Sequence, residues 1–133
     1  MTAYIAISYS QRNELAEELT VIKEVLVASG INPFVFIERF QFDPSQEKEM
    51  MQEAMRQLDT TDLLIAETSD KAIGIGIEAG YAKAKGKPVI YIRNKKAEHS
   101  TTLSGISDQQ VIYENSIDLK EKLQMILKQV MKP

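Results

Sequence analysis

Short apolar runs alternate with segments of helical periodicity along the whole chain. Five of these runs predict buried strands, because apolar residues follow one another in them with little polar interruption. They are Tyr4–Ile7, Pro33–Ile37, Leu63–Ala66, Pro88–Ile92 and Val111–Tyr113. Between the runs, apolar residues recur at intervals of three and four, which is typical of helices that pack on a sheet. They are Leu15, Leu19, Ile22 and Leu26, then Met51, Met55 and Leu58, and finally Leu119, Leu123, Ile126 and Val130.

The stretch from Thr61 to Ile92 holds two of these strands with a helix between them. Such a unit normally forms a right-handed parallel crossover. Its helix follows Gly74 and Gly76 and ends at Gly86. Helical spacing predicts that one broad face packs on the sheet, formed by Ile73, Gly76, Ile77, Gly80, Tyr81 and Ala84. Glu78 then lies on the flank of that face, where its replacement by Gln would cost about 0.5 kcal/mol or less.

Strands and helices that alternate in this way predict one α/β domain over residues 1–133. We expect a doubly wound, flavodoxin- or Rossmann-like parallel sheet of five strands in the order 2-1-3-4-5, with helices on both faces. This order places the loops after the first and third strands side by side, so Tyr9 and Glu78 face one crevice. Asp43, Pro44 and Gln46 predict a capping box at the start of the second helix. The polar stretch Arg93–Ser107 predicts a long loop that belongs to a site or an interface.

Composition and charge remove several classes of function. The chain has 16 basic and 19 acidic residues, a net charge of -3, which argues against a nucleic-acid partner. It has no cysteine, which excludes disulfides, thiol nucleophiles and Cys-ligated zinc, and its single histidine, His99, fits a surface loop. No apolar run has the length of a membrane span and no signal segment opens the chain, so we expect a cytoplasmic protein without a membrane partner. We expect neither a metal site nor a cofactor.

Gly74, Gly76 and Glu78 together carry the candidate chemistry. A helix start after two glycines offers backbone N–H groups to a phosphate or sugar oxygen. The pattern is neither a P-loop nor a full dinucleotide fingerprint, because Ala79 holds the last glycine position and no acidic residue follows about twenty positions on. A carboxylate beside such a loop suits attack at a sugar anomeric carbon. The competing interpretation is an acidic residue that only favours the helix dipole.

Three segments resemble the nucleoside 2-deoxyribosyltransferase superfamily, and in particular its 2'-deoxynucleoside 5'-phosphate N-hydrolases. They are DLLIAE at 62–67, GIGIEAGYA at 74–82 and GKPV at 86–89. The resemblance implies that Glu78 is the nucleophile at C1' of a nucleoside or nucleotide and that Tyr9 positions it. It also implies a homodimer, in which Ser100 and Ser104 reach the phosphate bound by the partner subunit. Further substrate-binding candidates from the same loops are Ser8, Ser10, Thr68, Ser69, Gly74 and Gly76.

The sequence departs from this family at three positions. Ala54 stands where a second carboxylate is expected, Ile7 replaces a glycine, and Ala72 replaces a phosphate-binding serine, which leaves Thr68, Ser69 and Lys71 as substitutes. Loss of the acid implies either changed leaving-group chemistry or no turnover. If activity on ordinary nucleotides is nevertheless fast, Glu67 and Glu53 are the first groups to consider as the acid. The helix with Met50, Met51 and Met55, together with the loop 93–107, offers the dimer surface.

Two other functions remain open at this point. The same fold serves non-catalytic nucleotide-binding or signalling modules, and fold alone does not separate them from enzymes. In addition, the segment Ile5–Ser10 resembles the opening of Toll/interleukin receptor-like domains, some of which hydrolyse NAD through a glutamate. Release of a free base from nucleosides, nucleotides or NAD would separate these functions.

Overall fold

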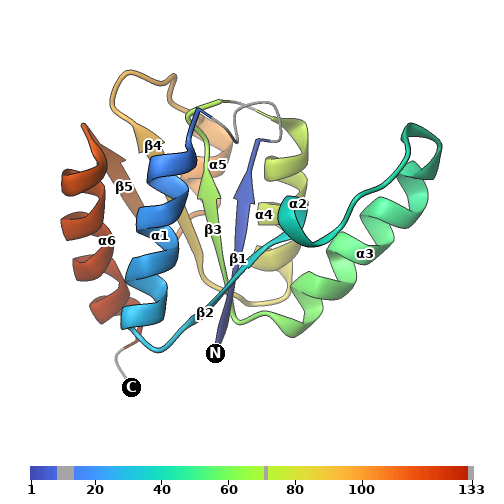
Figure 1. Ribbon diagram of the computed structural model, residues 1–133, viewed down its shortest axis with the longest axis horizontal. Coiled ribbons are helices and arrows are strands. Elements are labelled where there is room, and N and C mark those ends of the chain that lie inside the picture. Colours follow the sequence, from blue (N-terminus) through green and yellow to red (C-terminus); the bar gives the residue numbers. More distant parts are fainter. Residues whose placement is uncertain (9–13, 71, 132–133) are drawn as a thin grey trace.

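The computed structural model describes residues 1–8, 14–70 and 72–131 and contains one five-stranded sheet (Figure 1). All strands are parallel, in the order β2-β1-β3-β4-β5, which confirms the predicted topology. The strands are β1 (Thr2–Ile7), β2 (Asn32–Val35), β3 (Leu63–Glu67), β4 (Val89–Asn94) and β5 (Gln109–Tyr113). The helices are α1 (Ala16–Ala28), α2 (Phe36–Arg39), the 3-10 turn η2 (Pro44–Gln46), α3 (Glu47–Thr60), α4 (Ile73–Ala84), α5 (Thr101–Ile106) and α6 (Ser116–Val130).

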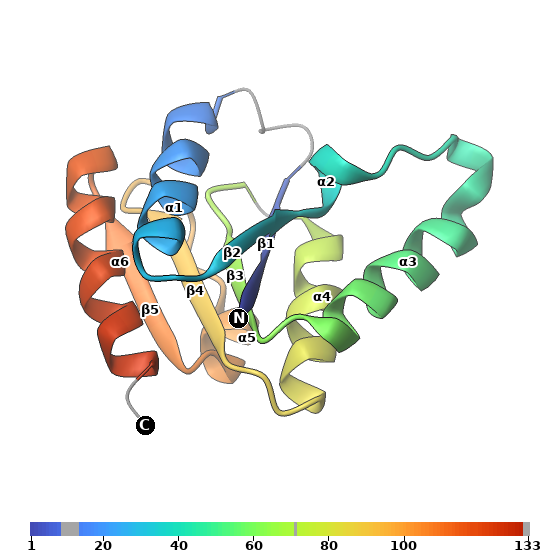
Figure 2. The ribbon, with the colours of Figure 1, turned by 60° about the horizontal axis from the view of Figure 1, so that its bottom comes forward.

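Helices cover both faces of the sheet. Side chains alternate along each strand, so Ile5 and Ile65 enter one apolar cluster while Tyr4 and Leu64 enter the other. The first cluster is closed by α1 and α6, which lie side by side (Figure 2), and the second by α3, α4 and α5. Among the described residues, no helix combines the length and the apolar composition that crossing a bilayer requires.

The strand order reverses direction between β1 and β3. Ile7 at the end of β1 pairs with Glu67 at the end of β3, so the two following loops leave the sheet next to each other. In open α/β sheets this reversal opens a crevice at the carboxyl ends of the strands, where ligands bind. The helix α4, which carries Glu78, begins six residues after β3 at this same edge.

The second strand is shorter than predicted. We expected Pro33–Ile37, whereas β2 ends at Val35 and the chain turns into α2. A helical turn places residues four apart on one face, and the rings of Phe36 and Phe40 stack there with centroids 5.2 Å apart. This aromatic packing ends the strand early. The capping box at Asp43 and Gln46 is present as predicted, with η2 leading into α3.

The segment 93–107 contains α5, which the sequence analysis treated as loop. The Ser100 side chain caps this helix by accepting a hydrogen bond from the backbone N–H of Leu103, at 3.3 Å. Leu103 is buried and Ile106 packs against the same apolar cluster, so the helix is held by the usual three-residue spacing.

The orientation of α4 corrects a prediction. The face that packs on the sheet consists of Ile75, Ala79 and Ala82, which are buried. Ile73 and Ile77, predicted to face the sheet, are 85% and 47% exposed. The rotation places Glu78 beside the buried face, because it lies three residues after Ile75 and four before Ala82.

Candidate active site

Glu78 makes its principal contact with Tyr4, a residue 74 positions earlier in the chain. The Tyr4 hydroxyl, on the central strand β1, donates a hydrogen bond to Glu78 Oε2. Tyr4 is completely buried, and its ring lies in the apolar cluster between the sheet and α4. The contact therefore fixes one carboxylate oxygen of Glu78 against the sheet. The resemblance assigned this positioning role to Tyr9, which lies outside the described residues together with Ser10.

The surroundings of Glu78 change its ionisation. Burial raises the pKa of Glu78 to about 7, although the hydrogen bond from Tyr4 favours the charged form. Burial also raises the pKa of Tyr4, and the nearby Glu78 carboxylate adds to this, so the tyrosine stays a proton donor. Glu78 is therefore a carboxyl group that changes its charge near neutral pH, as is common for residues in active sites.

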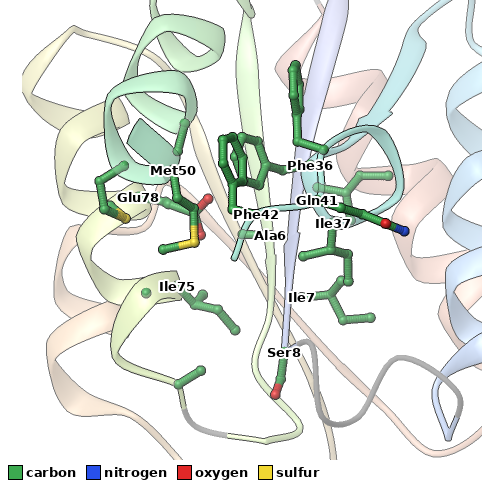
Figure 3. Close-up of a pocket in the computed structure, with 16 residues that line it drawn as sticks. Ala6, Ile7, Ser8, Phe36, Ile37, Gln41, Phe42, Met50, Ile75 and Glu78 are labelled. Atoms are coloured by element: carbon green, nitrogen blue, oxygen red, sulfur yellow. The ribbon is translucent and has the colours of Figure 1, made fainter. Parts of the chain in front are cut away.

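A cavity of about 570 Å³ opens beside Glu78, within the usual size range for small-molecule sites. Glu78 and Ile75 extend into it from α4, toward the side formed by Phe42 and Ala6 (Figure 3). Ser8 lies at the edge of the cavity where β1 ends. The other lining residues are Ile5, Ile7, Phe36, Ile37, Phe40, Gln41, Met50, Met51, Ala54, Ala72 and Gly74.

Three of the four phenylalanines of the chain, Phe36, Phe40 and Phe42, line this cavity. Phe36 and Phe42 lie nearly parallel, with an interplanar angle of 12° and centroids 6.2 Å apart, and Phe36 also stacks on Tyr4. Phe34 packs behind them between Tyr4 and Phe40. The sequence analysis placed Phe34 and Phe36 only in a strand. Four phenylalanines within nine residues were the signal that could have indicated an aromatic wall.

Ala54 lines the same cavity as Glu78 and is 2% exposed. A carboxylate at this position would thus enter the same space, but alanine cannot supply a proton. Glu53 points elsewhere, since it accepts hydrogen bonds from Arg56 and Gln57 on the surface of α3. Among the described residues that line the cavity, Glu78 is the only one with an ionisable side chain.

Glu67 lies on the opposite face of the sheet from Glu78. It is 1% exposed and accepts hydrogen bonds from the Tyr113 hydroxyl, at 2.7 Å, and from the backbone N–H of Ser69. Burial raises the pKa of Glu67. Because the side chain of Glu67 points toward the cluster under α1 and α6, it has no direct path to the Glu78 cavity. It instead fixes the start of the loop that leads to α4.

The structure separates the other predicted binding residues into two groups. Ser8 and Gly74 line the Glu78 cavity, and Ser8 donates a hydrogen bond to Asp70 at 3.0 Å. A second cavity of about 410 Å³ lies between α4 and α5, lined by Thr68, Gly76 and Ser100 among others.

Two predicted binding residues line neither cavity. The Ser69 hydroxyl accepts a hydrogen bond from the backbone N–H of Asn94, and Ser104 accepts one from Gln110. Both hydroxyls thus have partners within the fold itself.

Comparison with known proteins relates this geometry to a family. The model of the family described as nucleoside 2-deoxyribosyltransferase matches residues 3–127. The chain belongs to this family. The chemistry of the family is cleavage or transfer at the N-glycosidic bond of a nucleoside, in agreement with the resemblance noted in the sequence.

A curated relative supports the same assignment. It is a candidate 2'-deoxynucleoside 5'-phosphate N-hydrolase of Thermofilum pendens, 32% identical over 85 residues. The match covers 60% of this chain and 59% of the relative, so the chain spans about three fifths of the length of that protein.

Solved structures share the fold of this nucleoside 2-deoxyribosyltransferase family member. The CMP N-glycosidase BcmB of Clostridium botulinum aligns with a TM-score of 0.68 at 20% identity, over 94% of this chain and 99% of the other. A 2-deoxyribosyltransferase of Bacillus psychrosaccharolyticus aligns with a TM-score of 0.67 at 15% identity, over 90% of both chains. At these identities the likeness concerns the fold.

Proposed function

We propose that this protein cleaves or transfers the N-glycosidic bond of a nucleoside or nucleotide, with Glu78 as the nucleophile. The observation that carries the proposal is the position of Glu78: a half-buried carboxyl group held by Tyr4 on the wall of a small-molecule cavity. Membership of a family with this chemistry supports the proposal. A residue placed only to favour the helix dipole would have no need of this buried partner.

The proposed reaction uses the two oxygens of Glu78 differently. Tyr4 binds Oε2, which leaves Oε1 to attack C1' of the sugar. The C1'–N bond breaks, its electron pair leaves with the base, and a glycosyl ester of Glu78 forms. Water then attacks C1' and restores the carboxylate, or a second base attacks and receives the sugar. The apolar cavity excludes bulk water around the base and strengthens the attraction between the carboxylate and the developing positive sugar.

The proposed substrate is a small nucleoside or nucleotide. The aromatic rings of Phe36 and Phe42 suit the flat face of a base. Gly74, at the first turn of α4, offers backbone N–H groups and the positive end of the helix dipole to a phosphate or sugar oxygen. The name of the curated relative, an N-hydrolase of 2'-deoxynucleoside 5'-phosphates, agrees with a substrate that carries a phosphate.

The test of this proposal is base release from a panel of nucleosides and deoxynucleotides, followed by chromatography. We expect release by the wild type and a loss of several orders of magnitude in Glu78→Gln. Glu53→Gln is the matched control, because Glu53 is a partly buried carboxylate of α3 that does not line the cavity. Base release by Glu78→Gln at the normal rate would refute the nucleophile. Binding without base release by the wild type would indicate a binding module.

We also propose that the chain forms a homodimer, through the exposed face of α4 in place of the predicted methionine surface, because Met50 and Met51 line the cavity. Ile73 and Ile77 lie on this face, 85% and 47% exposed, beside the second cavity. Burial of two such side chains contributes about 3–6 kcal/mol if it is complete. We expect a dimer at micromolar concentration by light scattering and a monomer for Ile77→Asp. Ile117→Asp is the control, because Ile117 is 71% exposed on the distant helix α6. A monomeric wild type would refute the proposed dimer.

A further inference from the structure

In the part of the Glu78 cavity that the structure describes, the lining carries a negative charge and aromatic side chains, and no second group there can protonate a leaving base. Among its described lining residues, Glu78 is the only ionisable one, and the neutral polar side chains are those of Ser8 and Gln41. Ala54 occupies the place from which a second carboxyl group would reach the cavity. The described lining therefore provides a nucleophile without a partner acid.

This combination selects among leaving groups. The ordinary neutral bases of nucleotides depart more easily when a general acid protonates them, which is worth a factor of about 100 to 10,000 in rate. A base that carries a positive charge in the substrate, such as a pyridinium ring joined to the sugar through its nitrogen, becomes neutral as the bond breaks. It needs no proton. For such a substrate the missing acid has no consequence.

The surface of the cavity also favours a cation. Phe36, Phe40 and Phe42 line it. An aromatic ring attracts a cation that lies over its face by about 0.5–2 kcal/mol. The ionised Glu78 carboxylate adds a full negative charge in surroundings of low polarity. Arg39 of the nearby helix α2 lies over the ring of Phe34, 5.7 Å from its centroid, and no basic side chain is among the described residues that line the cavity.

We propose that the preferred substrates are N-glycosides of a cationic, pyridinium-type base. This inference rests on the proposed function, in which Glu78 is the nucleophile. Glu78 attacks C1', the bond from C1' to the ring nitrogen breaks, and the electron pair of that bond neutralises the ring, which leaves as an uncharged pyridine. Water then adds to C1' and releases the Glu78 carboxylate, the sugar with a free hydroxyl and one proton. Both charges present at the start are absent from the ester intermediate, so the first step needs neither an acid nor a base.

The experiment compares substrates of nearly equal shape that differ in charge. Nicotinamide nucleotide, in its ribosyl and 2'-deoxyribosyl forms, is compared with the neutral dihydronicotinamide forms and with the common deoxynucleoside monophosphates. We expect kcat/KM for the better cationic substrate to exceed that of every neutral one by about 100-fold or more, and we expect Glu78→Gln to abolish the reaction. Faster Glu78-dependent cleavage of a neutral nucleotide would overturn the inference and leave the proposed function standing. Cleavage of no substrate would overturn both.

A variant pair tests the cause of this selectivity. Ala54→Asp supplies an acid in the cavity, and Ala54→Asn supplies a group of the same shape that cannot donate an ionisable proton. We expect Asp, but not Asn, to raise cleavage of neutral nucleotides by at least about 10-fold relative to cleavage of the cationic substrate. Thermal melts of both variants verify that they fold. If both variants fold and Ala54→Asp and Ala54→Asn have equal effects, the inference is overturned. If either variant does not fold, the comparison of cationic and neutral substrates with the wild-type protein decides whether the inference holds.

Discussion

The ionisation of Glu78 makes a prediction about stability that requires no knowledge of the substrate. Burial raises the pKa of this carboxyl group from 4.5 to about 7, so the folded protein binds its proton more tightly than the unfolded chain does. The stability contributed by that proton is fully present below pH 4.5 and is lost as pH rises through 7. Glu78→Gln keeps an oxygen that can accept the Tyr4 hydrogen bond but never carries a charge. The variant therefore does not lose this contribution to its free energy of unfolding as the pH rises.

The size of the effect follows from the shift in pKa. Each unit corresponds to about 1.4 kcal/mol, so the upper limit is about 3 kcal/mol between pH 4 and pH 8. Glu78 is half-buried, and solvent screening reduces the expected value to about 2–3 kcal/mol. At pH 4 we expect the wild type and Glu78→Gln to differ by less than about 1 kcal/mol. At pH 8 we expect the variant to be the more stable protein by about 2–3 kcal/mol. This replaces the expectation, based on the position of Glu78 on the flank of its helix, that the substitution changes stability by about 0.5 kcal/mol or less.

The assay is urea denaturation of both proteins at several pH values from 4 to 8, with the free energy of unfolding taken from each curve. Glu67 has a raised pKa as well, but it is present in both proteins and cancels in their difference. Glu14→Gln, which removes an exposed carboxylate, controls for the change in net charge. A constant difference between wild type and Glu78→Gln across this range would refute the burial of Glu78, and with it the reason for placing the nucleophile at this cavity wall.

Further predictions concern the groups around Glu78. Tyr4→Phe removes a charge-assisted hydrogen bond of about 1.5–3 kcal/mol, so the pH at which cleavage reaches half of its maximum rises by about 1–2 units. The activity of Tyr4→Phe at pH 7 falls by about 5- to 50-fold and recovers at higher pH. The control is Tyr81→Phe, which removes the Tyr81 hydroxyl that binds Asp59 and leaves the pH dependence of cleavage unchanged. If Tyr4→Phe does not shift this pH dependence, the contact between Tyr4 and Glu78 is contradicted. Glu67→Gln releases base at a rate within about 10-fold of the wild type, because Glu67 lies on the opposite face of the sheet from Glu78. A loss of 100-fold or more in a folded variant would identify Glu67 as the general acid.

Much of the fold could be predicted because the apolar runs and helical repeats agree with each other. The strand order was predictable from the alternation of elements, since parallel strands joined by helices allow few arrangements. The face of α4 was not. Ile73 and Ile77 form one apolar face and Ile75, Ala79 and Ala82 form another, and periodicity alone cannot decide which one the sheet covers. Only the packing of the whole domain decides it.

The nucleophile candidate could be located from its place after Gly74 and Gly76, but its partner could not. The contact of Glu78 with Tyr4 joins residues that are distant in sequence, and a tyrosine in an apolar strand resembles ordinary core. A buried tyrosine usually binds a partner through its hydroxyl, and this rule was the available signal. The aromatic wall was hidden for a related reason, because Phe36 and Phe40 meet only when a strand gives way to a helix.

The two faces of α4 connect the site to the proposed dimer. One face carries Ile75, Glu78 and Ala82 toward the sheet and the cavity, and the other presents Ile73 and Ile77 to solvent. The small residues of α4 let it pack closely on the sheet, but they provide few large side chains to fix its position. A partner subunit that contacts the outer face of α4 would therefore also restrain the position of Glu78 beside its inner face. Tyr4 provides the only described hydrogen bond that ties Glu78 to the sheet. If the dimer forms as proposed, Ile77→Asp will therefore lower kcat as well as dissociate the subunits, whereas a monomer with full activity would show that the sheet and Tyr4 alone position Glu78.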